Sequence, residues 1–518
     1  MTPESIVPTL DPADLNWVGV LEHHAARTPD HSIAVGPEGT VTYAAMLGRS
    51  LRVAGALDAR GVGRGDVVGL LAYNSVDFLT TVFAANALGA IAMPVNWRLA
   101  AAEVRYMLEH SRAAAFVCDA ELAEVGAEAA SGLDLARVSI ESPGHRAPSG
   151  WEAFDALGEH TPLTRVATSG DDIHRLMYTS GTTGRPKGVM ITHANLAWKN
   201  SAHVAELGFT VDDVGLACGP LYHVGAFDLI TTSLISVGAT TIVHRAFDAA
   251  AVLDEIERSG VTCVWMAPAM LREVLDQPGV QDRDLSSVRL IIAGGEKLPI
   301  PFIDRLEQAF PSAWLADAYG LSETVSGDTF LDRAATRTKL GSVGRACLYL
   351  DLAVHDPEGN EVPPGERGEV VMRGPKVFAG YWRDEAATAK AFEGGWFHTG
   401  DVGMKDADGY LFIVDRLKDM IISGGENIAS SEVERVLDEH PAVLEVAVVG
   451  TPHERWGEVP VAHVVPRPGT TPTADELIEH CRAQLAKFKV PTAVHFLDEL
   501  PRNPSGKVLK RELRADAR

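Results

Sequence analysis

Apolar runs alternate with helix-length segments over residues 40–320 of the chain. Runs such as "DVVGLLAY", "VTCVWMAP" and "VRLIIAGGE" are continuously apolar, which is typical of strands buried on both faces of a parallel sheet. Segments of helical length, such as 78–88 and 100–110, separate these runs. The pattern predicts an α/β domain whose parallel sheets are covered by helices on both faces.

The pattern changes after about residue 340. "LAVHDPEGNEVPPGERGEVVMRG" places turn signals of Pro and Gly between short alternating runs, which predicts antiparallel sheet. A compact α+β pattern follows, in which Ser431 and Glu434 predict a capping box at the start of a helix. We therefore expect a large N-terminal domain of residues 1–415 and a smaller C-terminal domain of residues 416–518.

Charge and cysteine usage exclude several classes of protein. The 518 residues carry a formal net charge of -24, which argues against a nucleic-acid binder or a binder of acidic membranes. The five cysteines are scattered and include no C-x-x-C pair, so they predict reduced core thiols in a cytoplasmic protein.

One uncharged stretch, "FLTTVFAANALGAIAMPVN", is long enough to be considered as a membrane span. Thr, Asn, Gly and Pro interrupt its apolar residues. The stretch therefore predicts a helix that ends near Gly89 and is followed by a buried strand. We expect no integral membrane association.

The segment "YTSGTTGRPKG", residues 178–188, is rich in glycine and small hydroxyl side chains. Such a run is a poor helix and a poor strand, but its amides and hydroxyls can converge on an anion while a lysine balances the charge. It is not a Walker loop, because Lys187 is followed by Gly188 and not by Ser or Thr. Considered alone, the segment is more simply explained as a flexible loop, so the other motifs decide between the two.

Further motifs follow in a fixed order: "YHVGAF", "GGEKL", "YGLSET", "WFHTGD", "DRLKD", "SGGEN" and "NPSGKVLKREL". Two of them come directly after apolar strands, where α/β proteins place ligands. In this order and at this spacing, the motifs resemble those of the adenylate-forming superfamily, which includes acyl-CoA synthetases, coumarate ligases, luciferases and peptide-synthetase adenylation domains. The resemblance extends from about residue 15 to 515. One departure is Asn503-Pro504, where the family usually has Thr or a similar residue before the Ser-Gly-Lys motif.

The resemblance implies an ATP site. Tyr319 would stack on the adenine, Asp401 and Arg416 would bind the ribose, and Glu323 with Thr183 would hold Mg2+. Thr324 would contact the phosphate. The full set of implied nucleotide-binding residues is Thr179, Ser180, Gly181, Thr182, Thr183, Gly184, Lys187, Gly294, Gly295, Glu296, Ala318, Tyr319, Gly320, Ser322, Glu323, Thr324, Asp401, Arg416 and Lys507.

The resemblance also implies a reaction in two halves. A carboxylate attacks the α-phosphate of ATP, which gives an acyl-adenylate and pyrophosphate, and a thiol then displaces AMP. Positioning and charge neutralisation should dominate the first half, because two anions must meet. The residues implied in catalysis are Lys507, Glu323, His223 and Thr179.

Domain rotation about a hinge at Lys418 would separate the two halves of the reaction. The rotation would withdraw Lys507 and bring in the loop that lines a tunnel for the pantetheine of CoA. Glycine in that loop would let the backbone approach the thiol arm closely. The implied tunnel residues are His223, Ser423, Gly424, Gly425, Glu426 and Asn427.

The acyl pocket is the least specific part of the prediction. His223 would be the gate between the pocket and the tunnel, and the implied lining is His223, Phe227, Met266, Ala267, Ala293 and Val325. The apolar members would suit an ordinary core equally well. Asp228 would either select a polar group on the substrate or have a structural role. A fatty, an aryl or a polycyclic acid is compatible with this lining.

The expected fold is α/β, with a large N-terminal domain of two parallel-type αβαβα sheets plus a distorted β-barrel, and a small mobile α+β C-terminal domain. The expected function is that of an ATP-dependent carboxylic acid–CoA ligase with ATP, Mg2+ and CoA, monomeric or homodimeric. Three alternatives stay open: a ligase that loads an acyl carrier protein, a luciferase-like oxygenase and an inactive nucleotide-binding relative.

Overall fold

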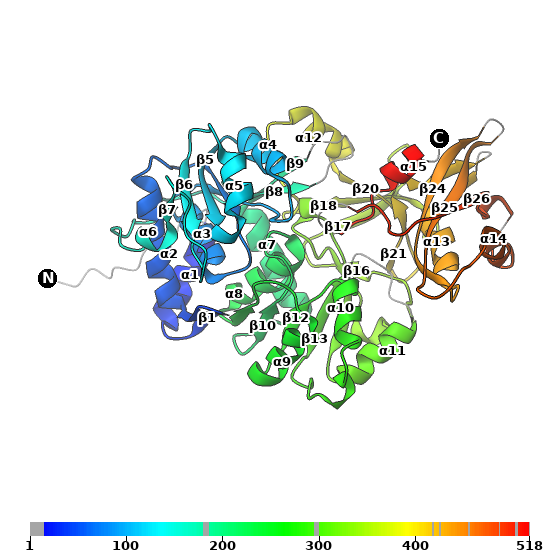
Figure 1. Ribbon diagram of the computed structural model, residues 1–518, viewed down its shortest axis with the longest axis horizontal. Coiled ribbons are helices and arrows are strands. Elements are labelled where there is room, and N and C mark those ends of the chain that lie inside the picture. Colours follow the sequence, from blue (N-terminus) through cyan, green and yellow to red (C-terminus); the bar gives the residue numbers. More distant parts are fainter. Residues whose placement is uncertain are drawn as a thin grey trace. The chain divides into compact units, whose positions relative to one another are not determined.

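The computed structural model describes residues 15–179, 186–294, 300–416, 419–423, 426–453, 456–485, 487–502 and 506–516. The chain divides into two compact units (Figure 1). Unit 1 contains the described residues up to Asp351 together with Met372–Phe397. Unit 2 contains Leu352–Val371 and the described residues from His398 onward. The predicted boundary between residues 415 and 416 lies within unit 2, and it stays a prediction about which segment moves.

The first sheet of unit 1 has nine strands, and its middle strands are parallel. Only strands at its two edges run antiparallel to their neighbours. In spatial order the strands are β16 (Arg345–Ala346), β15 (Thr329–Phe330), β14 (Trp314–Tyr319), β13 (Leu290–Gly294), β12 (Cys263–Trp265), β10 (Val214–Ala217), β11 (Thr240–Val243), β1 (Ser32–Gly36) and β2 (Gly39–Thr42).

The second sheet of unit 1 has eight strands, and it is parallel except for β9 and β19. In spatial order the strands are β19 (Gly380–Tyr381), β9 (Lys187–Thr192), β8 (Ile173–Thr179), β4 (Ile91–Pro94), β3 (Val67–Leu71), β5 (Ala113–Asp119), β6 (Ala136–Ile140) and β7 (Glu152–Ala153). The two sheets confirm the predicted parallel α/β architecture, because their central strands are the apolar runs of the sequence.

Helices cover both sheets of unit 1. In Figure 1, α9, α10 and α11 lie along the nine-stranded sheet, and α4 and α5 lie along the eight-stranded sheet. The helices of unit 1 are α1 (Trp17–Arg27), α2 (Tyr43–Asp58), α3 (Val76–Ala87), α4 (Ala101–Ser111), α5 (Ala123–Ala130), α6 (Phe154–Leu157), α7 (His193–Leu207), α8 (Ser233–Val237), α9 (Ala249–Ser259), α10 (Pro268–Leu275), α11 (Ile300–Ala309) and α12 (Glu385–Ala391), with a π-helix over Gly225–Thr232.

Helix α3 accounts for the uncharged stretch of the sequence. Every residue of α3 is buried, so the helix needs no charged face. The hydroxyl of Ser75 caps it by accepting a hydrogen bond from the Phe78 amide at 3.0 Å, and buried strand β4 follows. The predicted helix and strand are confirmed. Among the described residues, no helix combines the length and the apolar character that a membrane span requires.

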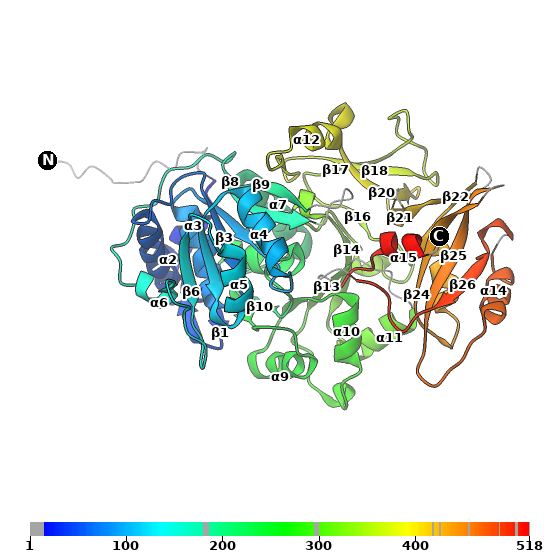
Figure 2. The ribbon, with the colours of Figure 1, turned by 45° about the horizontal axis from the view of Figure 1, so that its top comes forward.

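Unit 2 contains two sheets. The region for which the sequence predicts a distorted β-barrel forms a four-stranded sheet, with β17 (Asp351–His355), β18 (Gly368–Arg373), β20 (Phe397–Lys405) and β21 (Leu411–Arg416) in that order. The other sheet has five strands, β23 (Glu426–Ile428), β22 (Ile421–Ser423), β25 (Gly457–Pro466) and β24 (Val443–His453), with β26 (Ala493–Phe496) paired to β25. The helices are α13 (Ser430–Asp438), α14 (Ala474–Arg482) and α15 (Lys510–Asp516); Figure 2 shows α14 beside β26.

The predicted capping box at the start of α13 is wrong. The N-cap is Ala429, which offers no side-chain acceptor. Ser431 donates its hydroxyl to the Val414 carbonyl, and Glu434 accepts a hydrogen bond from the Val448 amide at 2.7 Å. Glu434 also pairs with Lys510 at 2.7 Å. Tertiary contacts to neighbouring elements have therefore replaced the local cap.

Candidate active site

The predicted phosphate loop connects two antiparallel strands of unit 1. Strand β8 ends at Thr179, β9 begins at Lys187, and these two residues are paired across the ladder. The pairing places Thr179 and Lys187 side by side at the two ends of the loop. Five further predicted loop residues, Ser180, Gly181, Thr182, Thr183 and Gly184, lie outside the described residues.

The predicted adenine segment lies at the carboxyl ends of β13 and β14, which is the edge where parallel α/β sheets bind ligands. Gly294 is paired with Ala318 across the two strands. A Cβ atom on Gly294 would lie 2.1 Å from the Ala318 carbonyl oxygen, so a larger residue cannot replace this glycine without moving the strands. Tyr319 ends β14, and Gly320 follows. Gly295 and Glu296 lie outside the described residues.

Glu323 lies on a short helical turn, Ser322–Thr324, directly after this edge. Its carbonyl oxygen accepts a hydrogen bond from the Phe378 amide at 2.7 Å. Its carboxylate oxygen Oε1 accepts a hydrogen bond from the Tyr381 hydroxyl at 3.0 Å. Both donors come from the segment around β19, so this segment holds the Glu323 backbone and side chain.

Tyr381 also contacts the lysine of the phosphate loop. The Nζ atom of Lys187 lies 4.8 Å from the centroid of the Tyr381 ring, within the range of a cation–π interaction. Burial, together with the Glu323 charge, raises the pKa of Tyr381, so the phenol keeps its proton and donates it. Tyr381 thus links Lys187 to Glu323. Tyr381 is not among the residues predicted from the sequence, because nothing in the sequence pattern connects it to residues so distant along the chain.

Glu323 fits a magnesium ion that is shared with a triphosphate. Mg2+ is usually bound by one or two carboxylates together with substrate phosphates and water. The Glu323 carboxylate would supply the protein ligand of that set, and Lys187 could pair with the phosphate oxygens. Within the part of the chain that the structure describes, no group of three or more His, Cys, Asp or Glu side chains could hold a metal by itself.

The Thr324 hydroxyl forms its hydrogen bonds with other groups of the protein. Thr324 is buried, and its hydroxyl lies within hydrogen-bond distance of the Asp328 carboxylate and of the Leu321 carbonyl oxygen, the latter at 3.1 Å. In this arrangement Thr324 closes the turn that carries Glu323. Its predicted contact with phosphate stays a prediction.

His223 lies just before the π-helix Gly225–Thr232 and is exposed. Its Nδ1 atom accepts a hydrogen bond from the Gly225 amide at 3.1 Å, which orients the ring. The indole of Trp265, at the end of β12, lies alongside with its centroid 6.1 Å away. The π-helix is a local irregularity of a kind that is frequent at functional sites.

The predicted acyl-pocket residues other than His223 pack mainly in the core. Phe227 is buried between Trp17, Phe78 and the guanidinium of Arg175. The other predicted members are either buried or, for Ala267, partly buried: Met266, Ala267, Ala293 and Val325. Their predicted contact with the acyl group stays a prediction.

Asp228 has a structural role, which was one of the two roles considered for it from the sequence. Its carboxylate pairs with Arg175 at 2.5 Å, and both side chains are fully buried. Its backbone carbonyl accepts a hydrogen bond from Lys199. Asp228 therefore holds the π-helix to β8 and α7.

Unit 2 carries the predicted ribose, tunnel and lysine motifs. Asp401 on β20 and Arg416 on β21 are paired across the antiparallel ladder, which places the two predicted ribose-binding residues on adjacent strands. Asp401 is buried, and its amide donates to the Thr399 hydroxyl at 3.0 Å. Lys507 is exposed and lies beside Val508, which forms a bridge with Arg502. Lys418 lies outside the described residues.

The predicted tunnel loop joins β22 and β23. Ser423 is paired with Glu426, and Ile422 with Asn427. Gly424 and Gly425 lie outside the described residues. Apart from His223, which lies in unit 1, the predicted tunnel residues that are described therefore belong to a pair of antiparallel strands.

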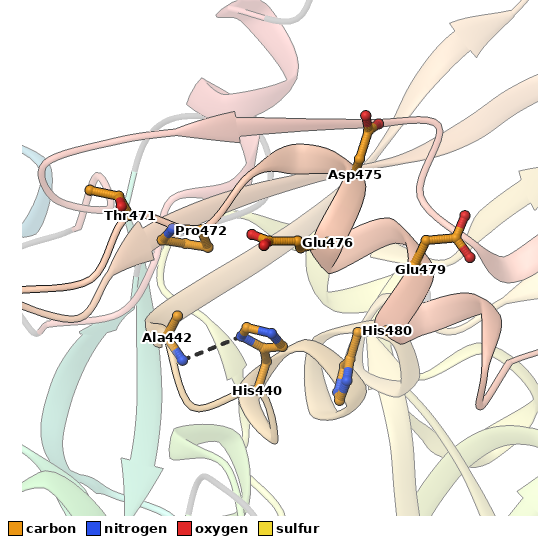
Figure 3. A pocket seen from close by; sticks show the side chains of 8 residues that line it. All are labelled: His440, Ala442, Thr471, Pro472, Asp475, Glu476, Glu479 and His480. Atoms are coloured by element: carbon orange, nitrogen blue, oxygen red, sulfur yellow. Dashed lines mark hydrogen bonds between the residues drawn. The ribbon is translucent and has the colours of Figure 1, made fainter.

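A hollow of about 720 Å³ is found elsewhere in unit 2 (Figure 3). It is lined by His440, by Ala442 and by side chains from the segment 471–480. The Ala442 amide donates to His440 Nδ1 at 3.3 Å, and the two imidazole rings of His440 and His480 meet edge to face. None of the predicted site residues lines this hollow, so we do not assign the reaction to it.

Comparison with known proteins matches both parts of the chain to family descriptions. Residues 21–382 match the AMP-binding enzyme family, and residues 432–507 match the AMP-binding enzyme C-terminal domain. The feruloyl-CoA synthase of an Amycolatopsis species is 41% identical over 491 residues, which is 94% of this chain and 96% of that protein. The indoleacetate–CoA ligase of Aromatoleum aromaticum is 40% identical over 500 residues, with coverage of 95% and 96%.

Solved structures of o-succinylbenzoate coenzyme A synthetase from Bacillus subtilis have the same fold. The complex of that enzyme with ATP and magnesium superposes with a TM-score of 0.85 at 32% identity, over 96% of this chain and 99% of that chain. The same enzyme has been solved with its acyl-adenylate intermediate, with a TM-score of 0.84.

Proposed function

The chain belongs to the AMP-binding enzyme family and is an AMP-forming carboxylate–CoA ligase that uses ATP, Mg2+ and CoA, and we propose that the Lys187, Tyr381 and Glu323 group is where it neutralises the triphosphate. The observation that carries this proposal is the convergence of Lys187 and Glu323 on one tyrosine. The Lys187 ammonium can pair with phosphate oxygens, and the Glu323 carboxylate can bind a metal ion. Held by the same tyrosine, the two groups suit a triphosphate with its metal.

In the first half of the reaction, the carboxylate of the acid attacks the α-phosphate of ATP and pyrophosphate leaves. Lys187 and the hydroxyls of the phosphate loop would hold the β- and γ-phosphates. Glu323 would hold Mg2+, which when bound withdraws negative charge from the phosphate oxygens. Lys507 would bridge the carboxylate and an α-phosphate oxygen, so that two anions can approach each other.

In the second half, the CoA thiol attacks the carbonyl carbon of the acyl-adenylate, the thiol proton is lost and AMP leaves. The proposed moving part is the segment 416–518, with Lys418 as the hinge. Its rotation would withdraw Lys507 and present the strand pair around Ser423 and Asn427 to the thiol arm. His223 would guard the passage between the acyl group and this arm.

The proposed substrate is a carboxylic acid that carries an aromatic ring. Two relatives at 40–41% identity act, by their names, on feruloyl and indoleacetate groups. We further infer a cytoplasmic protein, because the five cysteines are buried free thiols. CoA rather than a carrier protein is the proposed acceptor, and a monomer or homodimer is the expected state.

A panel of carboxylic acids tests this proposal. Aryl, indolyl, short-chain and long-chain acids are incubated with ATP and Mg2+, with and without CoA, while pyrophosphate, AMP and product mass are measured. We expect aryl acids to give the highest kcat/KM and to yield acyl-CoA. A preference for long-chain acids would contradict the substrate class, and release of AMP only with a carrier protein would contradict the acceptor.

A further inference from the structure

The turn that follows Glu323 has an unfavourable backbone conformation. Val325, Ser326 and Gly327 have φ angles of 57, 61 and 60° in succession. Positive φ is uncommon for non-glycine residues and a genuine outlier for a β-branched one. Such a conformation persists only where its surroundings impose it. The contacts of this turn therefore show what holds it.

Lys376 is the main group that contacts the turn. Its Nζ atom donates to the carbonyl oxygens of Ser326 and Gly327, each at 2.8 Å. The same atom lies 2.8 Å from Oδ1 of Asp328, and both side chains are buried. A buried ammonium is stable only when it is paired and hydrogen-bonded, and these three oxygens meet that requirement. His203 adds a contact, with Nε2 3.0 Å from the Gly327 carbonyl oxygen.

Asp328 connects Lys376 to the helical turn Ser322–Thr324, which carries Glu323. Its other carboxylate oxygen, Oδ2, accepts a hydrogen bond from the Thr324 hydroxyl. Its amide donates to the Tyr319 carbonyl oxygen at 2.7 Å. Thr324 is the neighbour of Glu323, and Tyr319 is the predicted adenine residue. The ion pair is therefore joined on both sides to residues of the proposed nucleotide site.

The segment that supplies Lys376 also supplies the two donors to Glu323. Phe378 binds the Glu323 carbonyl and Tyr381 binds its carboxylate. The segment 376–381 is thus attached to Glu323 itself, through Phe378 and Tyr381, and to the left-handed turn that follows Glu323, through Lys376. A shift of one relative to the other would turn the Glu323 carboxylate away from its present direction.

We propose that Lys376 and Asp328 are positioning residues, which hold the left-handed turn of residues 325–327 and thereby fix Glu323 and Thr324 for the metal–triphosphate complex. The proposal rests on the proposed role of Glu323. Neither side chain reaches solvent, so neither is expected to touch substrate. The pair acts through the backbone carbonyls and through Thr324.

Three variants separate positioning from simple stability. Lys376→Met removes the ammonium and leaves Asp328 buried without its ion pair, which is strongly destabilising. Lys376→Met with Asp328→Asn removes both charges, so stability should recover in part while the carbonyls of Ser326 and Gly327 still lack their donor. Lys199→Met is the matched control, because Lys199 is another fully buried lysine of unit 1 that contacts Asp228, Thr232 and Ser233 rather than the turn.

The first measurement is made on the ligand-free protein. Hydrogen exchange is followed by mass spectrometry in peptides that cover residues 319–330. We expect at least about 10-fold faster exchange in Lys376→Met and in the double variant, and wild-type exchange in Lys199→Met, because only the first two release the turn. Wild-type exchange in the double variant would overturn the proposal.

The second measurement separates the half-reactions. In the double variant we expect the Mg2+ concentration for half-maximal acyl-adenylate formation to rise about 10-fold and kcat/KM for ATP to fall about 10- to 100-fold. CoA thioester formation from pre-made acyl-adenylate should change less than about threefold. Equal loss in both half-reactions, or an Mg2+ requirement matching that of Lys199→Met, would contradict positioning. If wild-type protein forms no acyl-adenylate, the proposed function fails, and hydrogen exchange still decides whether the pair holds the turn.

Discussion

The hydroxyl of Tyr381 lies 3.0 Å from Oε1 of Glu323, although the two residues are 58 positions apart in the chain. The contact joins the edge strand β19 to the turn after β14, and so it connects the two sheets of unit 1. The Nζ atom of Lys187 lies over the ring of the same phenol. One partly buried tyrosine therefore sets the spacing between the lysine and the carboxylate of the proposed triphosphate site.

Replacing Tyr381 with Phe removes the hydrogen bond but keeps the ring under Lys187. Hydrogen bonds to charged groups contribute about 1.5–3 kcal/mol, so we expect kcat/KM for ATP to fall about 10- to 100-fold in pyrophosphate-release assays. Tyr43→Phe is the control, since Tyr43 donates to the Ala239 carbonyl in the core, at 2.8 Å. Similar kinetic losses in both variants would show that the effect is on stability alone.

Lys507→Ala should separate the half-reactions. Removal of one pre-aimed donor typically lowers the rate about 10²- to 10³-fold, so acyl-adenylate formation should become very slow. Thioester formation from pre-made acyl-adenylate should be largely spared, because Lys507 is withdrawn in that step. Rapid-quench measurement of each half-reaction checks this, and equal loss of both would argue against an alternating C-terminal segment.

Lys418→Pro should give the opposite result. Proline fixes φ near −65°, which would block rotation at the proposed hinge while leaving the first half-reaction intact. Acyl-adenylate should accumulate on the enzyme without thioester, whereas Lys418→Ala should turn over normally. Normal thioester production by the proline variant would exclude Lys418 as the pivot.

The stability of unit 1 should depend on the protonation of Asp77. Burial, partly offset by Arg49, raises the pKa of Asp77 to about 6. The folded state then binds this proton more tightly than the unfolded state, so the free energy of unfolding falls as pH rises from about 4 to about 6. The loss amounts to about 3 kcal/mol at most.

Asp77→Asn tests this dependence, because the variant carries no titrating group at that position. Relative to the wild type, it should gain stability progressively between pH 4 and pH 7 in denaturant unfolding. A constant difference across that range would show that Asp77 keeps the same pKa in both states.

The periodicity of the sequence was sufficient for the main architecture. The continuous apolar runs became central parallel strands, and the stretch before Gly89 became α3 followed by β4, because burial on both faces leaves a direct signature in composition. Local hydrogen-bonding signals were weaker. Ser431 and Glu434 have capping-box spacing, but the Val448 amide and Lys510 compete for Glu434.

The candidate site could be predicted only where it lies in contiguous motifs. Thr179 with Lys187, and Tyr319 with Glu323, are close in sequence and lie at or just beyond the ends of strands. Tyr381 and Lys376 contact Glu323 and its turn from a distant segment. A single sequence holds no pattern that connects groups across two sheets, so their contributions emerge only from the folded chain.

In the proposed mechanism, the carboxylate of the acid attacks the α-phosphate of ATP. The most direct test uses an aryl acid labelled with ¹⁸O in both carboxylate oxygens, incubated with ATP, Mg2+ and CoA, with the products analysed by mass spectrometry. We predict one ¹⁸O atom in the phosphate of AMP and one in the thioester carbonyl. Label in pyrophosphate or inorganic phosphate, with AMP unlabelled, would contradict the mechanism.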